Sequence, residues 1–311
     1  MISLVFPGQG SQKVGMGSDL CEKFDYSKKT LENANEILGY KISDLILNGP
    51  QEKLNQTTYT QPAIYLIGYL ICEVLKKETN FFEKKFNFFA GHSLGEYTAL
   101  TVANSFPLEQ GLLLLKHRGE AMQTAVPIGE GGMLAVLGVE TDELKNLINE
   151  NSNKIKCYLA NDNSKGQSIL SGRNDELEKF SLVLKEKKIK NIKLPVSAPF
   201  HCELMRSATS KMQMVINNQS FSDPKYKVVS NVTAKEYTEN NQIKKLLVQQ
   251  IESPVRWRES IEYMVANGTT TFVEIGPGKV LSGLIKRINK DVKVLNIESV
   301  EDIQGIDKWL I

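Results

Sequence analysis

The sequence predicts an α/β protein in which a small subdomain of strands and helices is inserted into a larger one. Short apolar runs followed by helical patterns recur along most of the 311 residues, which is typical of folds built on parallel sheets. One block in the middle of the chain has the order strand, helix, strand, strand, helix, strand. A chain of this length is also expected to form about two domains.

The first apolar run, residues 2–6, predicts a buried strand that ends in the glycine-rich loop Pro7-Gly8-Gln9-Gly10-Ser11-Gln12. The loop lacks the third glycine of a dinucleotide-binding motif, because Lys13 stands in its place, and no Gly-Lys-Ser/Thr follows. We therefore reject a nucleotide-binding interpretation. A loop at the carboxyl end of a strand lies at the functional edge of an open α/β sheet.

The most informative stretch is Gly91-His92-Ser93-Leu94-Gly95, where an apolar run ends and a helical segment begins. A serine on a sharp strand-to-helix turn adopts strained backbone angles, which requires neighbours without bulky side chains two positions away on either side. This turn would expose the Ser93 hydroxyl and direct the Leu94 N–H toward an oxygen bound beside it. The alternative is an ordinary glycine-rich turn with a solvated serine.

The middle block predicts a ferredoxin-like small subdomain over residues 125–198, and residues 1–124 and 199–311 then form the large subdomain. Its expected strands and helices are, in order, 133–139, 141–151, 155–161, 167–172, 174–187 and 189–195. In the large subdomain we expect helices at 26–38, 62–76, 95–104, 108–124, 203–216 and 243–251, and a last helix that ends at 288. We expect strands at 227–232 and 269–275, and a polar connector at 55–61.

Composition excludes several classes of protein. Hydrophobic residues are 41%, charged residues 24% and the net charge is +2, so nothing indicates binding to nucleic acid or to a membrane surface. The four cysteines form no C-x-x-C pair, which favours reduced thiols over a disulfide framework or a zinc site. The N-terminal residues have no signal-peptide pattern. We therefore expect a cytoplasmic protein without a metal.

A serine nucleophile needs a base within hydrogen-bond reach, and the chain has only three histidines. His92 adjoins Ser93 and would point to the opposite face, while His117 lies in a helix where a solvated role is expected. His201 follows a turn that returns from the small subdomain to the large one, where residues line clefts. His201 is thus the expected base, and a helix-capping histidine is the alternative.

Arg118 is the most informative charged residue, because its neighbours on the predicted helix face are apolar: Leu114, Leu115, Ala121 and Met122. A buried guanidinium must meet an anion or bear a large desolvation cost. The anion is either an internal Asp or Glu or the carboxylate of a bound ligand, which a guanidinium can hold through two parallel bonds. The second possibility predicts an acyl group that carries its own carboxylate.

Together these stretches resemble the malonyl-CoA:acyl-carrier-protein transacylase family over essentially the whole chain. Six motifs, in the family's order along the chain, carry the resemblance. They are residues 6–12, residues 91–97, residues 117–119, residues 196–201, the pair formed by Gln250 and residues 254–257, and residues 274–281.

The resemblance implies that an α/β-hydrolase-like core holds Ser93 as the acylated residue and His201 as the base. It also implies that the Gln9 and Leu94 amides form the oxyanion hole, that Arg118 holds the malonyl carboxylate, and that the Gln250 main-chain carbonyl orients the histidine. Phe200 and Met122 are expected in the substrate pocket. Phe200 stands where many bacterial members have serine, and a phenyl ring there would crowd an α-methyl branch and favour malonyl over methylmalonyl.

The implied activity is malonyl transfer from coenzyme A to the phosphopantetheine thiol of an acyl carrier protein in fatty acid biosynthesis, by a monomer without a cofactor. Carrier proteins of this kind are acidic, so a basic surface is expected. Residues 185–188 and 286–287 are candidates, although a solvated charge run is the favoured interpretation of each. Two rivals remain: a serine thioesterase or other hydrolase, and a non-catalytic scaffold that docks carrier proteins.

Overall fold

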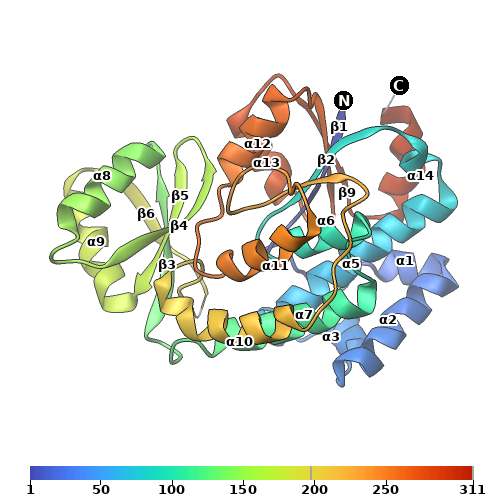
Figure 1. The fold of residues 1–311 in the computed structure, drawn as a ribbon, viewed down its shortest axis with the longest axis horizontal. Helices are drawn as coiled ribbons and strands as arrows, with labels where there is room; N and C mark the ends of the chain where they lie inside the picture. Colours follow the sequence, from blue (N-terminus) through green and yellow to red (C-terminus); the bar gives the residue numbers. More distant parts are fainter. Residues whose placement is uncertain (197, 310–311) are drawn as a thin grey trace.

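The protein consists of two lobes, each built around one sheet (Figure 1). A computed structural model describes residues 1–196 and 198–309. The larger lobe contains a parallel sheet with the strand order β7-β2-β1-β8-β9, and the smaller lobe contains an antiparallel sheet with the order β4-β5-β3-β6. This mixed α/β architecture confirms the predicted class.

The elements of the larger lobe follow one another as strands separated by helices. The strands are β1 (Ile2–Phe6), β2 (Phe86–Gly91), β7 (Lys227–Val229), β8 (Thr271–Ile275) and β9 (Lys293–Ile297). The helices are α1 (Ser18–Lys23), α2 (Asp25–Leu38), α3 (Ile42–Asn48), α4 (Gln51–Leu54), α5 (Thr57–Glu78), α6 (Gly95–Val102), α7 (Leu108–Gln123), α10 (Arg206–Asn217), α11 (Asn240–Gln249), α12 (Trp257–Ala266), α13 (Val280–Ile288) and α14 (Val300–Trp309), with short 3-10 turns at Phe81–Glu83 and Glu203–Met205.

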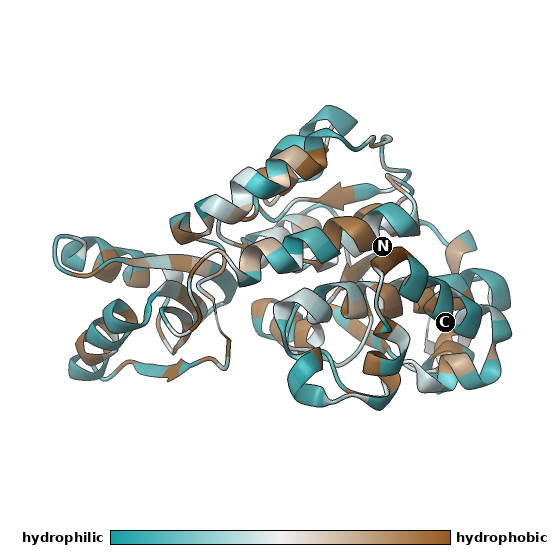
Figure 2. Cartoon of the chain, turned by 90° about the horizontal axis from the view of Figure 1, so that it is seen from below, coloured by the Kyte–Doolittle hydropathy of each residue, from teal (hydrophilic) through white to brown (hydrophobic). Residues whose placement is uncertain are grey.

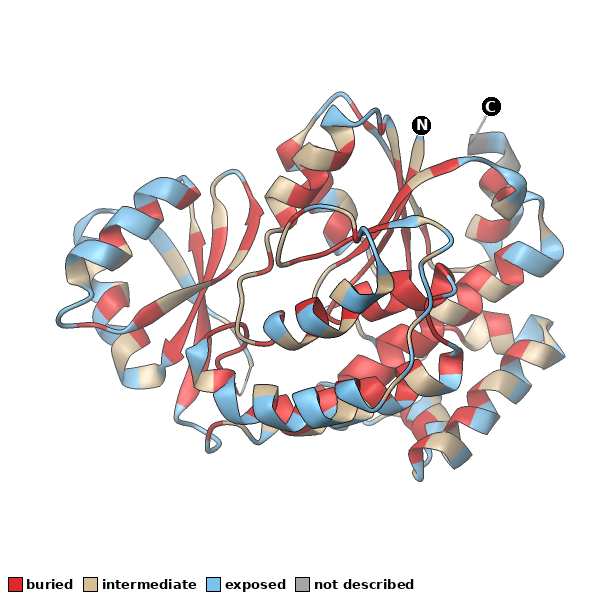
Figure 3. Cartoon of the chain, in the orientation of Figure 1, coloured by how far each residue is buried: buried red, intermediate tan, exposed pale blue. Residues whose placement is uncertain are grey.

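The parallel sheet is buried on both faces, as its continuous apolar strands predict. Successive side chains of β1 enter different cores: Leu4 and Phe6 belong to the core that includes α5, α6 and α7, while Val5 packs with α12 and α13 on the other face. Figure 3 shows the resulting buried layer through the sheet and the central helices. The helices carry mixed hydrophilic and hydrophobic residues along their length (Figure 2), as expected for helices that bury one face.

The smaller lobe has the predicted order of elements. It runs β3 (Gly131–Leu137), α8 (Thr141–Asn151), β4 (Cys157–Ser164), β5 (Gln167–Arg173), α9 (Asn174–Glu186) and β6 (Lys190–Lys193). Both helices pack on one face of the antiparallel sheet and enclose a separate small core.

The two lobes are joined by backbone hydrogen bonds as well as by the chain itself. The Val255 N–H donates to the Ala160 carbonyl at 2.8 Å, and the Asp162 N–H donates to the Val255 carbonyl at 3.0 Å. Arg258 on α12 then binds the Asp162 carboxylate, with Nη2 2.8 Å from Oδ2. Strand β4 is therefore fixed to the segment that precedes α12.

One expectation for the larger lobe was wrong, and several of its elements were not expected. The polar connector expected at 55–61 is mostly the first part of α5, which begins at Thr57, so Pro62 lies inside the helix rather than at its start. Buried hydrogen bonds stabilise this first turn, because the Thr60 hydroxyl donates to the Leu54 carbonyl at 2.6 Å. Strand β9 and helices α1, α3, α4, α12 and α14 were not expected. β9 is a half-exposed edge strand with little apolar alternation.

Candidate active site

Ser93 lies on the turn between β2 and α6, as the spacing of glycines predicts. Its φ is 53°, in the left-handed region that is strained for serine. A Cβ on Gly91 would lie 1.9 Å from the Gly95 carbonyl carbon, and one on Gly95 would lie 2.2 Å from the Phe6 carbonyl oxygen. Only glycine fits at either position, so the two glycines let the strand, the turn and the helix approach one another this closely.

The structure brings Ser93 and His201 together from positions 108 residues apart. Ser93 Oγ lies 2.9 Å from His201 Nε2, and His201 Nδ1 lies 2.8 Å from the main-chain carbonyl oxygen of Gln250. Because a carbonyl only accepts, Nδ1 carries the proton and Nε2 is the acceptor for the serine hydroxyl. His201 also has a left-handed φ of 59°. Ser197, part of the preceding motif, lies outside the described residues.

His201 is neutral in this environment. Burial, together with the nearby positive charge of Arg118, lowers the pKa of its imidazole to about 3. The residue is 4% exposed, so its charged form would have little access to water. A neutral imidazole with a free Nε2 lone pair can accept the serine proton.

Arg118 reaches the same point from α7. Its guanidinium donates from Nη2 to Ser93 Oγ at 3.0 Å and to Gln250 Oε1 at 2.8 Å, and from Nη1 to Gln61 Oε1 at 2.7 Å. The residue is 1% exposed, and burial lowers the pKa of the guanidinium. In the described part of the chain it makes no ion pair with a carboxylate, and its buried Nε has no hydrogen-bond partner.

The two residues whose backbone amides were expected to form the oxyanion hole lie at the carboxyl edge of the parallel sheet. Gln9 follows β1 at the carboxyl edge of the sheet, and Leu94 precedes the first residue of α6. Both residues line the pocket that contains Ser93. Neither N–H donates to another group within residues 1–196 and 198–309, so both amides can receive an oxygen.

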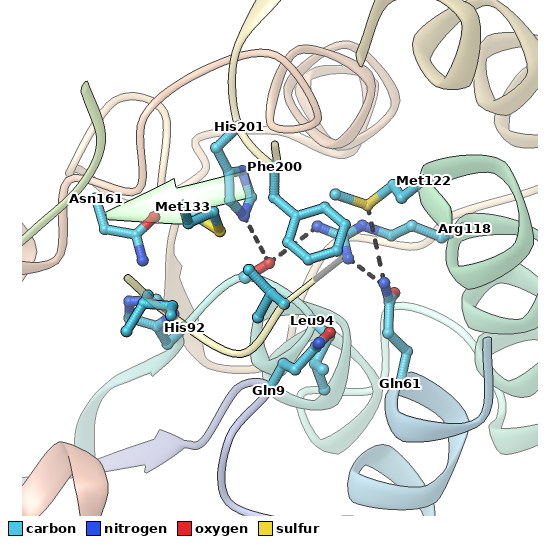
Figure 4. A pocket seen from close by; sticks show the side chains of 13 residues that line it. Gln9, Gln61, His92, Leu94, Arg118, Met122, Met133, Asn161, Phe200 and His201 are labelled. Carbon is cyan, nitrogen blue, oxygen red and sulfur yellow. Dashed lines mark hydrogen bonds between the residues drawn. The ribbon is translucent and has the colours of Figure 1, made fainter. Parts of the chain in front are cut away.

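These residues border a small cavity between the two lobes, with a volume of about 110 Å³. Figure 4 shows the side chains of Arg118, His201 and Phe200 converging on it, Arg118 from α7 and the other two from the segment that follows β6, with Met122 beside Arg118. Phe200 is largely buried beside the cavity and Met122 is fully buried. The cavity is lined by Gln9, Gln61, His92, Ser93, Leu94, Arg118, Met122, Met133, Asn161, Leu194, Val196, Phe200 and His201.

Sequence reasoning missed several polar residues around this cavity. Gln61 was assigned to a connector, whereas it lies on α5 with its amide oxygen on Arg118 and its nitrogen 3.8 Å from Met122 Sδ. Asn231 accepts from the Ser93 N–H at 2.7 Å and donates to the Gly91 carbonyl, also at 2.7 Å. Neither has a signal in a single sequence, because each acts through tertiary contacts.

The other two histidines lie where they were expected. His92 forms a hydrogen bond of 2.9 Å with Asn163 of the smaller lobe and does not contact the Ser93 hydroxyl. His117 is about half exposed, and its Nδ1 lies 4.0 Å from Glu120.

The candidate basic residues of the surface are partly engaged. Lys286 donates to the Val292 carbonyl at 2.6 Å, and Arg287 binds the Gln167 side chain.

No group of three or more His, Cys, Asp or Glu side chains within residues 1–196 and 198–309 is placed to hold a metal ion. Among the helices that can be described, none has the length and apolarity needed to cross a membrane.

Comparisons with known proteins identify the family. The family model described as acyl transferase domain matches residues 3–304. The chain is 41% identical over 307 residues to a malonyl CoA-acyl carrier protein transacylase of Bacillus subtilis, which covers 97% of this chain and 95% of the relative.

Solved structures give the same result. An acyl-carrier-protein-S-malonyltransferase from Bartonella henselae superposes with a TM-score of 0.95 at 39% identity, covering 99% of both chains. A malonyl-transacylase solved in complex with its type II PKS acyl-carrier protein superposes with a TM-score of 0.93 at 35% identity, over 98% of both chains. With full-length matches to curated and solved members, the chain belongs to the malonyl-CoA:acyl-carrier-protein transacylase family of acyl transferases.

Proposed function

We propose that this protein transfers a malonyl group from coenzyme A to the phosphopantetheine thiol of an acyl carrier protein. One observation carries the proposal: a serine hydroxyl, a neutral imidazole and a buried guanidinium without an ion-pair partner among the described residues converge on one cavity. The names of the relatives give the substrate and the carrier, and one relative was solved with its carrier protein.

The first half-reaction forms a malonyl-serine ester. His201 Nε2 takes the Ser93 proton while Oγ attacks the thioester carbon of malonyl-CoA. The carbonyl oxygen becomes an oxyanion that accepts hydrogen bonds from the Gln9 and Leu94 amides. The C–S bond then breaks, and the imidazolium gives its proton to the departing coenzyme A thiolate.

The second half-reaction repeats these steps in the opposite sense. His201 takes the proton of the carrier's thiol, the sulfur attacks the ester carbon, and the proton returns to Ser93 Oγ as the C–O bond breaks. Throughout both steps the Gln250 main-chain carbonyl holds the Nδ1 proton of His201 and so fixes the reactive tautomer. No cofactor is required by this scheme.

Arg118 selects the acyl group. A malonyl unit on Ser93 would carry its carboxylate a few bonds from Oγ, and the guanidinium already lies 3.0 Å from that oxygen. The unpartnered Nε and the absence of a carboxylate partner in the described residues favour a ligand anion over an internal one. Phe200 and Met122 then form apolar walls of the pocket.

The experiment that tests this proposal is intact-mass analysis of purified protein mixed with malonyl-CoA. We expect a malonyl adduct on Ser93 that persists until carrier protein or another thiol is added, and no adduct in Ser93→Ala. Ser207→Ala, an exposed serine on α10, is the matched control and should acylate normally. Rapid release of free malonate would support a thioesterase or other hydrolase instead. If Ser93→Ala still transferred malonyl groups to the carrier protein at the same rate, the alternative of a non-catalytic scaffold that docks carrier proteins would be supported.

The finer fold assignment is also a proposal. The central position of β3 in the order β4-β5-β3-β6, with both helices on one face, supports a ferredoxin-like small subdomain. The strand-turn-helix with Ser93 at the carboxyl edge of a parallel sheet supports an α/β-hydrolase-like large subdomain, with the divisions at residues 124 and 198. A monomer in the cytoplasm remains our prediction, as does fatty acid synthesis as the pathway of the carrier.

A further inference from the structure

A buried carboxylate behind the active site has no part in the mechanism above. Glu96 lies in the first turn of α6 and is 0% exposed. In the described part of the chain it forms no ion pair; its neighbours are hydrogen-bond donors. Tyr237 donates to Oε1, and the Asn231 N–H donates to Oε2 at 3.0 Å. Burial raises the pKa of the Glu96 carboxyl, and these hydrogen bonds partly offset that effect.

The third donor to Glu96 connects it with the active site. Gln250 Nε2 lies 2.6 Å from Glu96 Oε2, 3.0 Å from the Ser93 carbonyl oxygen and 3.4 Å from Asn231 Oδ1. All three neighbours are acceptors, so this end of the amide is the NH₂ group. The amide oxygen therefore points the other way, to Arg118 Nη2 at 2.8 Å.

A side-chain amide can bind a guanidinium only through its oxygen, and rotation by half a turn would place NH₂ against Arg118. Glu96 is the closest of the three acceptors on Nε2, so it contributes most to the choice between the two orientations. Arg118 is in turn held in place by Gln250 on one side and by Gln61 on the other.

We propose that Glu96 is a positioning residue for carboxylate recognition: acting through Gln250, it fixes the amide orientation that holds the Arg118 guanidinium beside Ser93. This inference rests on the proposed malonyl transfer. It separates two tasks within one residue, because the main chain of Gln250 serves His201 and its side chain serves Arg118. Loss of the Glu96 acceptor should therefore weaken recognition of malonyl groups and leave the chemistry at Ser93 intact.

The test compares kcat/KM for malonyl-CoA and acetyl-CoA, because an acetyl group has no carboxylate for Arg118 to hold. Glu96→Met keeps the volume and removes the acceptor, and we expect kcat/KM for malonyl-CoA to fall about 10- to 100-fold. The acetyl-CoA value should change less than about 3-fold. Glu96→Gln can present its oxygen to Gln250 and its NH₂ to Tyr237, so it should restore malonyl selectivity to within about 3-fold of the natural protein.

Gln250→Met provides the second arm, because it removes the side-chain amide and keeps the main-chain carbonyl that serves His201. Once Gln250→Met is present, adding Glu96→Met should cause no further loss of malonyl selectivity. Glu274→Gln is the control for a change at a buried carboxylate, since Glu274 caps α13 and does not contact this network. In Glu274→Gln the ratio of kcat/KM for malonyl-CoA to kcat/KM for acetyl-CoA should equal that of the natural protein.

Several outcomes would overturn the inference. These are equal losses on both substrates in Glu96→Met, failure of Glu96→Gln to restore selectivity, or additive losses in the double variant. If Glu96→Met does not fold, Gln250→Met tests the step that the inference needs: a selective loss for malonyl-CoA supports the contact of the amide with Arg118, and an equal loss on both substrates refutes the inference. If the natural protein forms no malonyl adduct, the proposed function has failed, and that result is separate from all of these.

Discussion

Replacement of Arg118 by alanine tests the carboxylate-binding role most directly. The guanidinium is 1% exposed and donates to Gln61, Gln250 and Ser93. Removing one partner of a buried, hydrogen-bonded charge pair costs about 2–5 kcal/mol. We therefore expect kcat/KM for malonyl-CoA to fall at least ~30-fold in Arg118→Ala, at about 1.4 kcal/mol per tenfold change. Acetyl-CoA should be accepted at least as well as before.

The assay should measure both substrates on one preparation, because the truncation leaves two buried amide oxygens without a donor. Each unsatisfied group costs about 1–3 kcal/mol of stability, so the total activity will fall for reasons unrelated to selectivity. The ratio of the two kcat/KM values removes that effect. Arg256→Ala is a suitable control, since Arg256 pairs with Glu259 on the partly exposed surface of α12. Equal losses for malonyl-CoA and acetyl-CoA would show that Arg118 is structural.

Two further predictions concern the other pocket residues. The unfolded chain binds a proton at His201 near pH 6.5, whereas the folded chain resists it until about pH 3, so this residue lowers the stability as the pH falls between those values and has no effect above them. As the pH falls from 6 to 4, the free energy of unfolding of His201→Gln should therefore decrease by up to ~1.4 kcal/mol per pH unit less than that of the natural protein. Parallel curves of unfolding free energy against pH for the two proteins would contradict the assigned burial. Phe200→Ala should raise the kcat/KM for methylmalonyl-CoA relative to malonyl-CoA by ~10-fold or more in a competition assay; an unchanged ratio would mean that the ring does not contact the α-carbon.

The positions of several candidate site residues could be predicted where local chemistry dictates structure. The glycines around Ser93 are explained by contacts that admit no Cβ, and such a requirement is visible as spacing. Arg118 was identified because a charged residue on an apolar helix face is costly. His201 was reached by elimination, which was possible only because the chain has three histidines.

The residues that the sequence did not reveal act at a distance along the chain. Gln61, Glu96 and Asn231 are ordinary polar residues whose roles arise from which elements the fold packs together. The beginning of α5 was misassigned for a related reason, since buried threonine hydrogen bonds outweigh the usual preference of proline for the first turn of a helix. Pattern and propensity carry no information about such contacts.

The backbone pairing between β4 and Val255 bears on attempts to build chimeras in this family. A graft of residues 125–198 from a relative would bring a new Ala160 and Asp162 to an unchanged Val255 and Arg258. Those contacts set the distance between the graft and its host, and Gln250 lies only five residues before Val255. An exchange designed to alter acyl preference should therefore transplant the 250–258 segment from the same donor.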